Sequence, residues 1–217
     1  MQRFGPVHRH CMENLVRIVS TLEVRSILDV GCGSGENLSG LAAADRYELT
    51  GIDVSGKALE LARQRVPDAR FLQMDVQHEA LSEKFDLVTS LQVVEHLPDD
   101  VSAIQNMARM ARKYVLISTV QGRMRPSEIK IGHVRNYSDT ELHRKLEMAG
   151  LEVVDVSRWG FPFYSPLYRS LVEWLPGGPP DGPLGPTAKL ASRLLYNIYR
   201  LNLPGRGDII FALSRKP

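Results

Sequence analysis

The residues that could perform chemistry begin with a glycine-rich stretch near the start of the chain. An apolar run ends in Asp29, and Gly31, Gly33 and Gly35 follow at alternate positions before a helical pattern that starts at Glu36. Glycine lacks a Cβ, so such a turn can adopt unusual dihedral angles and a ligand can lie against bare backbone. The stretch is typical of a buried strand, a tight turn and a ligand-binding helix N-terminus, although an ordinary strand-to-helix turn fits it as well.

The acids beside this turn narrow the class of ligand. In the dinucleotide fingerprint G-x-G-x-x-G, a pyrophosphate rests on the helix N-terminus. Here Gly35 comes one position early, and Glu36 stands where the fingerprint has its third glycine. A carboxylate there would repel phosphate, and Asp29 is also acidic. The turn therefore favours a ligand with no phosphate and a positive end, and S-adenosylmethionine has these properties.

Two more apolar segments, 48–53 and 70–76, are predicted strands with acids near their ends, Asp53 and Asp75. A carboxylate at the tip of the second strand can accept hydrogen bonds from both ribose hydroxyls, in NAD sites as in methyltransferase sites. Asp53 therefore indicates a bound nucleoside without identifying it. The alternative roles are a helix cap for Asp53 and a surface turn for Asp75.

The turn, the two acids, and the string F-D-L-V at 85–88 followed by E-H-L-P-D at 95–99 resemble, in this order, the class I S-adenosylmethionine-dependent methyltransferases, small-molecule subgroup. The resemblance covers about residues 25–160. It implies an S-adenosyl-L-methionine site in which Asp75 bonds the adenine amine and Gln92 lies near the substrate. The cofactor contacts that it implies are Asp29, Gly31, Cys32, Gly33, Gly35, Asp53, Val54, Asp75, Val76, Ser90 and Leu91.

Two histidines are candidates for a general base, which is needed only if the methyl acceptor must lose a proton. His133 lies in a G-H-V-R-x-Y-S string that resembles the same subgroup. The resemblance implies that His133 and Tyr137 lie over the carboxyl edge of the sheet, with Tyr137 as a candidate substrate contact. Imidazole has a suitable pKa for this role. His133 is the first candidate and His96 the second. The alternatives are that His133 fixes its loop and that His96 caps the turn before the next helix.

The predicted reaction is methyl transfer to an oxygen, nitrogen or carbon nucleophile of a small molecule, which could be apolar or anionic, quinone-like or a secondary metabolite. The chain lacks both the Asn-Pro-Pro-Tyr string used on planar amines and the Asp-Asn pair of magnesium-dependent catechol enzymes. We therefore expect no metal. The alternatives are a nicotinamide-dependent oxidoreductase and a non-catalytic S-adenosylmethionine-binding protein.

Hydrophobic patterning predicts alternating strands and helices. The resemblance implies that they form an α/β, Rossmann-like fold with a seven-stranded, mostly parallel sheet, an antiparallel last strand and helices on both faces. The strands are expected at 26–30, 48–53, 70–76, 85–91, 113–119, 151–156 and 207–213, and the main helices at 6–22, 35–44, 56–66, 98–111 and 139–149. Residues 1–24 would form a helical cap whose His8 and His10 are solvated. The long segment 120–137 is predicted to be a loop, either solvated or a basic edge that binds an anionic group through Arg123, Arg125, Lys130 and Arg135.

An insert at 160–206 separates the last two strands. It contains a predicted helix at 165–174, a glycine- and proline-rich segment at 176–186, and a second helix with Leu190, Leu194, Ile198 and Leu201 on one face. We rank a lid over an apolar substrate pocket first, a homodimer face second and a membrane-surface helix third. Phe161, Phe163 and Tyr164 are the candidate substrate contacts of the lid.

Composition sets the remaining limits. The chain has 217 residues, 43% hydrophobic content, a formal net charge of +2 and a pI near 8.6. These values suit one soluble domain over 1–217, which the resemblance implies is a methyltransferase domain, and they do not favour a nucleic-acid partner. Two cysteines, no apolar signal core and no apolar run long enough to span a bilayer predict a cytoplasmic protein with free thiols.

Overall fold

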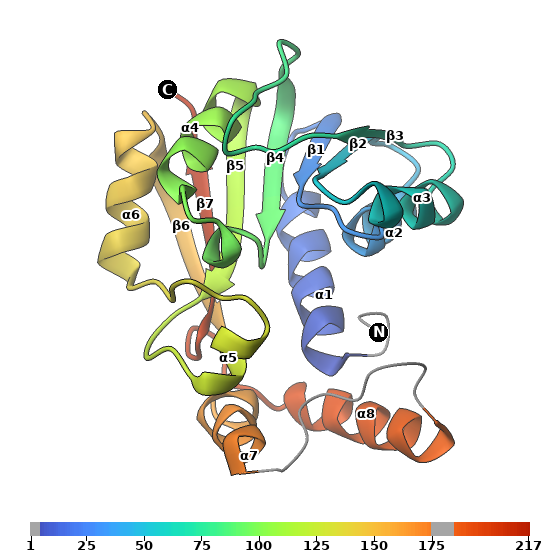
Figure 1. Ribbon diagram of the computed structural model, residues 1–217, viewed down its shortest axis with the longest axis vertical. Helices are drawn as coiled ribbons and strands as arrows, with labels where there is room; N and C mark the ends of the chain where they lie inside the picture. The colour runs from blue at the N-terminus through green and yellow to red at the C-terminus, as the bar shows by residue number, and fades with distance from the viewer. Residues whose placement is uncertain (1–4, 175–184) are drawn as a thin grey trace.

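A computed structural model describes residues 5–174 and 185–217 of the chain. At its centre is a seven-stranded sheet of order β3-β2-β1-β4-β5-β7-β6 (Figure 1). The strands are β1 Ser26–Val30, β2 Glu48–Asp53, β3 Arg70–Gln73, β4 Phe85–Leu91, β5 Ala111–Val120, β6 Glu152–Trp159 and β7 Ile209–Arg215. All neighbouring pairs are parallel except those of β7, which runs antiparallel to β5 and β6. The predicted sheet is confirmed.

Helices cover both faces of the sheet. One layer consists of α1 Pro6–Ser20, α2 Glu36–Ala42 and α3 Gly56–Arg65, and the other of α4 Asp100–Met110 and α6 Asp139–Met148. Side chains alternate across a strand, so Ile27 packs with the first layer while Leu28 and Val30 pack with the second. Strands buried on both faces explain the continuous apolar runs in the sequence.

Side-chain caps fix where the helices begin. Ser55 before α3 and Ser138 before α6 each accept a hydrogen bond of 3.2 Å from the backbone N–H three residues ahead. Asp99 caps α4 in the same way at 3.0 Å. Asp99 is therefore the N-cap residue of α4.

Two elements differ from the prediction. Strand β3 ends at Gln73, three residues early, because Asp75 Oδ1 accepts a hydrogen bond of 2.9 Å from the backbone N–H of Gln77 and turns the chain. The segment 120–137, predicted to be a loop, contains the short helix α5, Pro126–Lys130. Proline is favoured at the first position of a helix, where its missing N–H has no intrahelical partner in any case.

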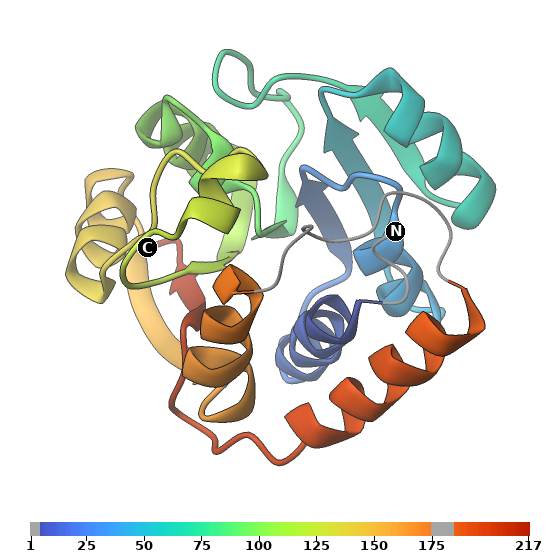
Figure 2. The same cartoon turned by 60° about the horizontal axis from the view of Figure 1, so that its bottom comes forward.

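The insert folds as a π-helical turn at Phe163–Tyr168, then α7 Arg169–Trp174 and α8 Pro186–Tyr199. Most of its glycine- and proline-rich segment lies outside the described residues. Helices α5, α7 and α8 gather at the end of the molecule toward which β4 points (Figures 1 and 2). The insert therefore lies at the carboxyl edge of the sheet, where ligands bind in open α/β folds.

An aromatic cluster joins the insert to α1. The imidazole of His10 stacks on Tyr196 and Trp159 at centroid distances of 4.5 and 5.0 Å, and its Nε2 lies 2.9 Å from the carbonyl of Tyr196. His10 is 4% exposed, so the expectation that it is solvated was wrong. Burial of its ring, the largest influence, lowers the pKa of His10.

Two expectations from composition can be compared with the fold. Cys11 and Cys32 are buried free thiols, as predicted. Among the described residues, no helix combines the length and apolar character needed to cross a bilayer.

Candidate functional site

The turn between β1 and α2 is held by the neighbouring strand. The backbone N–H groups of Gly31 and Cys32 both donate to the carbonyl of Ile52 in β2, at 2.8 and 3.0 Å. The Cys32 side chain is buried, so this residue offers a ligand its backbone alone. The turn is therefore fixed in place before any ligand arrives.

The three glycines of this turn all have left-handed backbones, with φ of +69° at Gly31, +52° at Gly33 and +77° at Gly35. A Cβ on Gly31 would lie 2.5 Å from Val93 Cγ2, which requires something to shift. A Cβ on Gly33 would meet nothing within 4 Å beyond its chain neighbours. The middle of the turn thus presents bare backbone to open space, as a ligand cradle requires.

Asp53, at the tip of β2, faces the turn. Its Oδ2 accepts a hydrogen bond from Gly33 N–H and its Oδ1 accepts one from Ser55 N–H, both at 2.8 Å. A carboxylate has about four acceptor positions, so two remain for ligand hydroxyls. The next residue, Val54, is exposed beside it.

Asp29 lies under the turn with 1% of its surface exposed. Its Oδ1 accepts 2.8 Å from Thr89 Oγ1, while its Oδ2 has no hydrogen-bond partner. Burial raises the pKa of Asp29 to about 7. Nearby on β4, the buried Ser90 Oγ also lacks a partner, and Leu91 is buried beside it. Buried polar atoms are rarely left unpaired, so this pair indicates room for a ligand or a water molecule.

Glu36 begins α2, and its carboxylate lies between two basic side chains. His8 Nε2 of α1 lies 3.1 Å from Oε2, and an Arg65 nitrogen of α3 lies 3.3 Å from Oε1. Although burial alone would raise it, these two partners hold the pKa of Glu36 below its usual value. His8, expected to be solvated, instead connects α1 to the ligand turn.

The segment after β3 places Asp75 at the same edge. Its carboxylate accepts from Gln77 Nε2 as well as from Gln77 N–H, and Oδ2 lies 3.8 Å from His78 Nε2. Val76 is buried, and its carbonyl accepts 2.8 Å from Asn106 Nδ2 of α4. Asp75 is therefore positioned by its own turn and keeps a partly exposed side chain.

Gln92 has a left-handed backbone, with φ of +56°, directly after β4. Its N–H donates 2.8 Å to the carbonyl of Ser118, and its Nε2 donates 3.2 Å to Ser118 Oγ. Non-glycine residues rarely adopt this conformation, and such strain is concentrated at functional sites.

The two candidate bases lie together. The rings of His96 and His133 meet edge-to-face with centroids 4.6 Å apart, although 37 positions separate them in sequence. His133 Nδ1 lies 3.4 Å from Asn136 Oδ1, so Nδ1–H donates there and Nε2 keeps its lone pair. Burial, followed by the nearby His96, lowers the pKa of His133.

Sequence reasoning missed Glu95, which completes this cluster. It is fully buried, its Oε2 accepts 3.0 Å from Thr119 Oγ1, and its Oε1 has no partner. Burial raises its pKa to about 7. Ligand-type atoms of Glu95, His96 and His133 all lie within 4.8 Å of one another, a donor set that could also hold a metal ion. The available sequence signal for Glu95 was its position directly before the candidate base His96.

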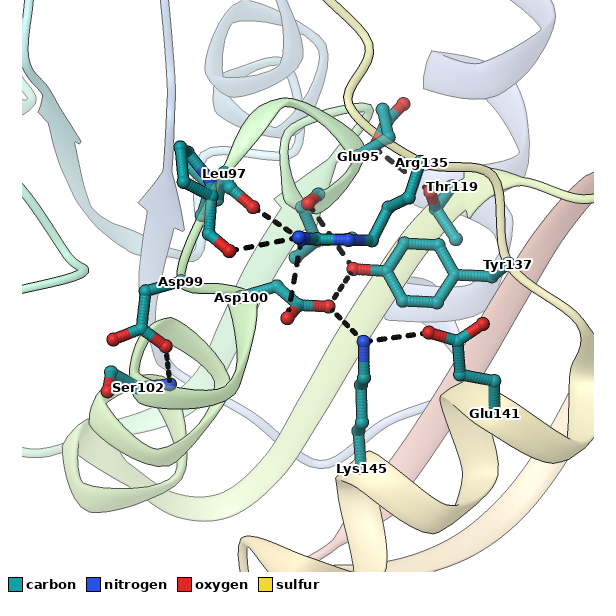
Figure 3. Close-up of polar contacts among 12 residues, drawn as sticks. Glu95, Leu97, Asp99, Asp100, Ser102, Thr119, Arg135, Tyr137, Glu141 and Lys145 are labelled. Carbon is teal, nitrogen blue, oxygen red and sulfur yellow. Dashed lines mark hydrogen bonds and ion pairs between the residues drawn. The ribbon is translucent and has the colours of Figure 1, made fainter. Parts of the chain in front are cut away.

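Asp100 anchors the segments that carry these residues (Figure 3). It is 3% exposed, and its Oδ2 accepts from Lys145 Nζ of α6 at 2.6 Å and from the Tyr137 hydroxyl. Arg135 lies 3.3 Å from Oδ1 and donates to the carbonyls of Leu97 and Pro98. Arg135 is therefore committed to the fold and does not belong to a basic edge for an anionic substrate.

Tyr137, predicted to contact substrate, lies in the core instead. It is 1% exposed, and its hydroxyl donates to Asp100 and lies 3.3 Å from the carbonyl of Val94. Burial and the bond to Asp100 raise its pKa. The Tyr137 side chain therefore stabilises the fold, and we do not retain it as a substrate contact.

The candidate aromatic contacts of the insert are half-buried. Tyr164 stacks on Trp159 at 5.5 Å and belongs to the aromatic cluster. Phe163 N–H donates 3.0 Å to Asn202 Oδ1, and the Phe161 ring lies 5.9 Å from the Arg206 guanidinium. At least Tyr164 therefore packs the insert onto the domain.

Comparison with known proteins supports a methyltransferase-type domain in the first part of the chain. A family model described as a methyltransferase domain matches residues 28–117, which include the glycine turn, Asp53, Asp75 and the strings F-D-L-V and E-H-L-P-D. The ubiquinone biosynthesis O-methyltransferase of Alkalilimnicola ehrlichii is 37% identical over 117 residues, covering 50% of this chain and 47% of that protein. These matches support the resemblance of the chain to the class I S-adenosylmethionine-dependent methyltransferases.

Solved structures share the fold of this chain over nearly its whole length. The N-methyltransferase NodS from Bradyrhizobium japonicum, solved with S-adenosyl-L-homocysteine, aligns with a TM-score of 0.65 at 20% identity, covering 98% of this chain and 89% of that one. The [4+2]-cyclase SpnF aligns with a TM-score of 0.68 at 18% identity, covering 97% and 82%. Because a cyclase has the same fold, the fold alone does not define the reaction. The chain spans about half the length of the first curated relatives it matches.

The anchoring role of Asp100 can be measured by replacing it. We expect Asp100→Ala to lower the free energy of unfolding by about 3–5 kcal/mol, because Lys145 and Arg135 lose the carboxylate that compensates their charge. The matched control is its neighbour Asp99→Ala, which removes one helix cap and should cost about 1 kcal/mol. Equal losses in urea denaturation would contradict the anchoring role.

Proposed function

We propose that this chain transfers the methyl group of S-adenosyl-L-methionine to a hydroxyl oxygen of a small molecule. The observation that carries the proposal is the bare left-handed turn at Gly33, bonded to Asp53 and underlain by the unpartnered Asp29 Oδ2. This arrangement offers acceptors for ribose hydroxyls and an anionic group for a positive ligand.

The residues present fit S-adenosyl-L-methionine. The cradle at Gly33 leaves space that a side chain would fill, Asp53 keeps acceptor positions for the ribose, and Asp75 offers a carboxylate for the adenine amine. When bound, the cofactor supplies an electrophilic methyl group, so the protein has to orient the acceptor and manage its proton.

An oxygen acceptor is supported by the proton-accepting groups and by the relatives. His133 is largely neutral at pH 7 with a free Nε2 lone pair, and the buried Glu95 titrates near neutrality beside it. A hydroxyl must lose its proton on methylation, and this cluster can accept it. The relatives of this chain include several ubiquinone biosynthesis O-methyltransferases. From these relatives we further propose that the substrate carries an apolar, quinone-like ring.

The two alternatives are tested by direct titration of the full chain. We expect calorimetry to detect binding of S-adenosyl-L-methionine and S-adenosyl-L-homocysteine and no binding of NADH, because a diphosphate would meet acidic side chains at the turn. Gly33→Val should abolish binding by filling the cradle, whereas Gly122→Val, another left-handed glycine with open space, should not. Binding of NADH without binding of S-adenosyl-L-methionine would contradict the proposal. A non-catalytic binding protein would bind the cofactor yet methylate no phenolic acceptor.

Cofactor affinity should depend on pH through Asp29. Its pKa is raised to about 7 by burial, so the carboxyl is partly protonated in the free protein at neutral pH. A ligand cation favours the carboxylate, so binding releases a proton and affinity should increase between about pH 6 and 7.5. Calorimetry in buffers of different ionisation enthalpy measures that proton. Asp29→Asn should remove the pH dependence of the affinity. Asp53→Asn should weaken binding at every pH but leave the pH dependence in place. If the affinity of Asp29→Asn changed with pH as it does in the wild type, the proposed role of Asp29 would be contradicted.

His133→Ala should lower kcat by about 10²-fold or more while the Kd for S-adenosyl-L-homocysteine stays unchanged, because only proton removal is lost. His143→Ala is the matched control, since His143 is an exposed histidine of α6 that pairs with Glu147. Normal turnover in His133→Ala would remove it from the mechanism. EDTA should leave turnover unchanged; activity lost to EDTA and restored by Zn²⁺ would assign Glu95, His96 and His133 to a metal instead.

A further inference from the structure

Helix α8 carries a row of large apolar side chains that the domain leaves uncovered. Leu190, Leu194 and Ile198 follow at four-residue spacing, and Leu201 extends the row just past the helix end. Their exposed fractions are 58%, 57%, 41% and 65%. Residues at this spacing lie on one side of a helix, so the row is a continuous apolar stripe.

The stripe points away from the rest of the protein. Helix α8 packs on α1 through Tyr199, which is 1% exposed, and through Tyr196, whose ring stacks on His10. The Arg9 guanidinium lies 3.7 Å from the centre of the same Tyr196 ring. At 100° per residue these tyrosines fall on nearly the opposite side of the helix from Leu190 and Leu194. The helix is therefore held by one face while the other meets solvent.

A basic row runs beside the apolar stripe. Lys189, Arg193 and Arg200 each come one position before a member of the stripe, so they line one of its edges, and all three are exposed. Arg206 adds a further positive charge nearby in sequence, and the segment 186–207 contains no aspartate or glutamate. Long basic side chains can keep their charged ends in water while their stems lie along apolar material.

The apolar exposure continues on neighbouring parts of the insert. Leu167 and Leu171, in the π-helical turn and α7, are 57% and 54% exposed. Figure 2 shows α7 and α8 at the same end of the molecule, the end that holds the carboxyl edge of the sheet. The feature thus belongs to the side on which a substrate would enter.

We propose that α8 docks the protein on the surface of a bilayer that contains anionic lipids. An apolar stripe with a basic edge and no acid is the pattern of a helix that lies in the membrane interface. Its 14 residues extend about 21 Å, which suits a helix lying flat on the surface. The stripe enters the acyl boundary, and Lys189, Arg193 and Arg200 meet lipid phosphates.

A second copy of the chain fits this face less well. A twofold dimer would place the same patch of both copies together, because such an interface is self-complementary. Each patch carries Lys189, Arg193 and Arg200 without any acid in α8, so like charges would approach one another. Charge complementarity therefore favours an anionic partner surface.

Sedimentation with vesicles tests the proposal on the full chain. We expect the protein to pellet with vesicles of phosphatidylcholine mixed with phosphatidylglycerol, weakly with phosphatidylcholine alone, and less as salt increases. Leu194→Ser with Ile198→Ser should weaken partitioning at least about tenfold, because the stripe loses its centre. The control pair, Leu61→Ser with Met148→Ser, removes equally exposed apolar side chains from α3 and α6 and should bind normally.

Charge variants separate the two parts of the interaction. Arg193→Gln with Arg200→Gln should remove the preference for phosphatidylglycerol, whereas Lys57→Gln with Arg144→Gln, the same charge change elsewhere on the surface, should keep it. Circular dichroism confirms that each variant is folded. The proposal is overturned if the protein pellets with neither vesicle, if the stripe variants bind as well as the wild type, or if light scattering shows a dimer that Leu194→Ser with Ile198→Ser dissociates.

Discussion

The fixed backbone at the end of β1 is the constraint on which the site depends. Gly31 and Cys32 both donate to the carbonyl of Ile52, and Val93 leaves no room for a side chain on Gly31. The turn is thus held between β2 and the segment after β4, which makes the order of these strands part of the site. Because the left-handed conformation is held by the fold, the N–H groups of the turn are oriented without being ordered by a ligand.

Three buried acids differ in how many of their carboxylate oxygens have hydrogen-bond or ion-pair partners. Asp100 has both oxygens engaged, by Tyr137, Lys145 and Arg135, and it holds loops together. Asp29 and Glu95 each have one bonded oxygen and one without a partner, and burial raises the pKa of both to about 7. An acid left half-satisfied in the interior costs stability, so its retention is best explained by a group that it meets during function.

Strands and strand-end acids could be predicted from the sequence, because a buried parallel strand needs a continuous apolar run and ligand-facing residues follow directly after it. The same local logic found Asp53. It failed where distant residues decide the outcome. His10 is buried because α8 returns to pack on α1. Tyr137 is anchored by Asp100, which lies in α4. The G-H-V-R-x-Y-S string predicted that Tyr137 lies near the site, but it could not show which way the side chain points.

The insert illustrates a further limit of periodicity. Helix α8 has apolar residues on two sides, and hydrophobic spacing alone does not tell which side packs. In the structure the tyrosine side packs on α1 and the leucine side stays exposed. At its other end the insert is fixed by Arg169, which donates to Glu128 and Asp208.

Glu128 also accepts from Asn136, the partner of His133, at 2.8 Å. Although burial alone would raise it, the bonds from Asn136 and Arg169 hold the pKa of Glu128 below its usual value, so this link is an ionised one. Both described ends of the insert are therefore attached to the domain by specific contacts, one of them next to the candidate base. The exposed stripe on α8 is consequently a property of a docked helix, and its exposure needs an explanation outside the domain.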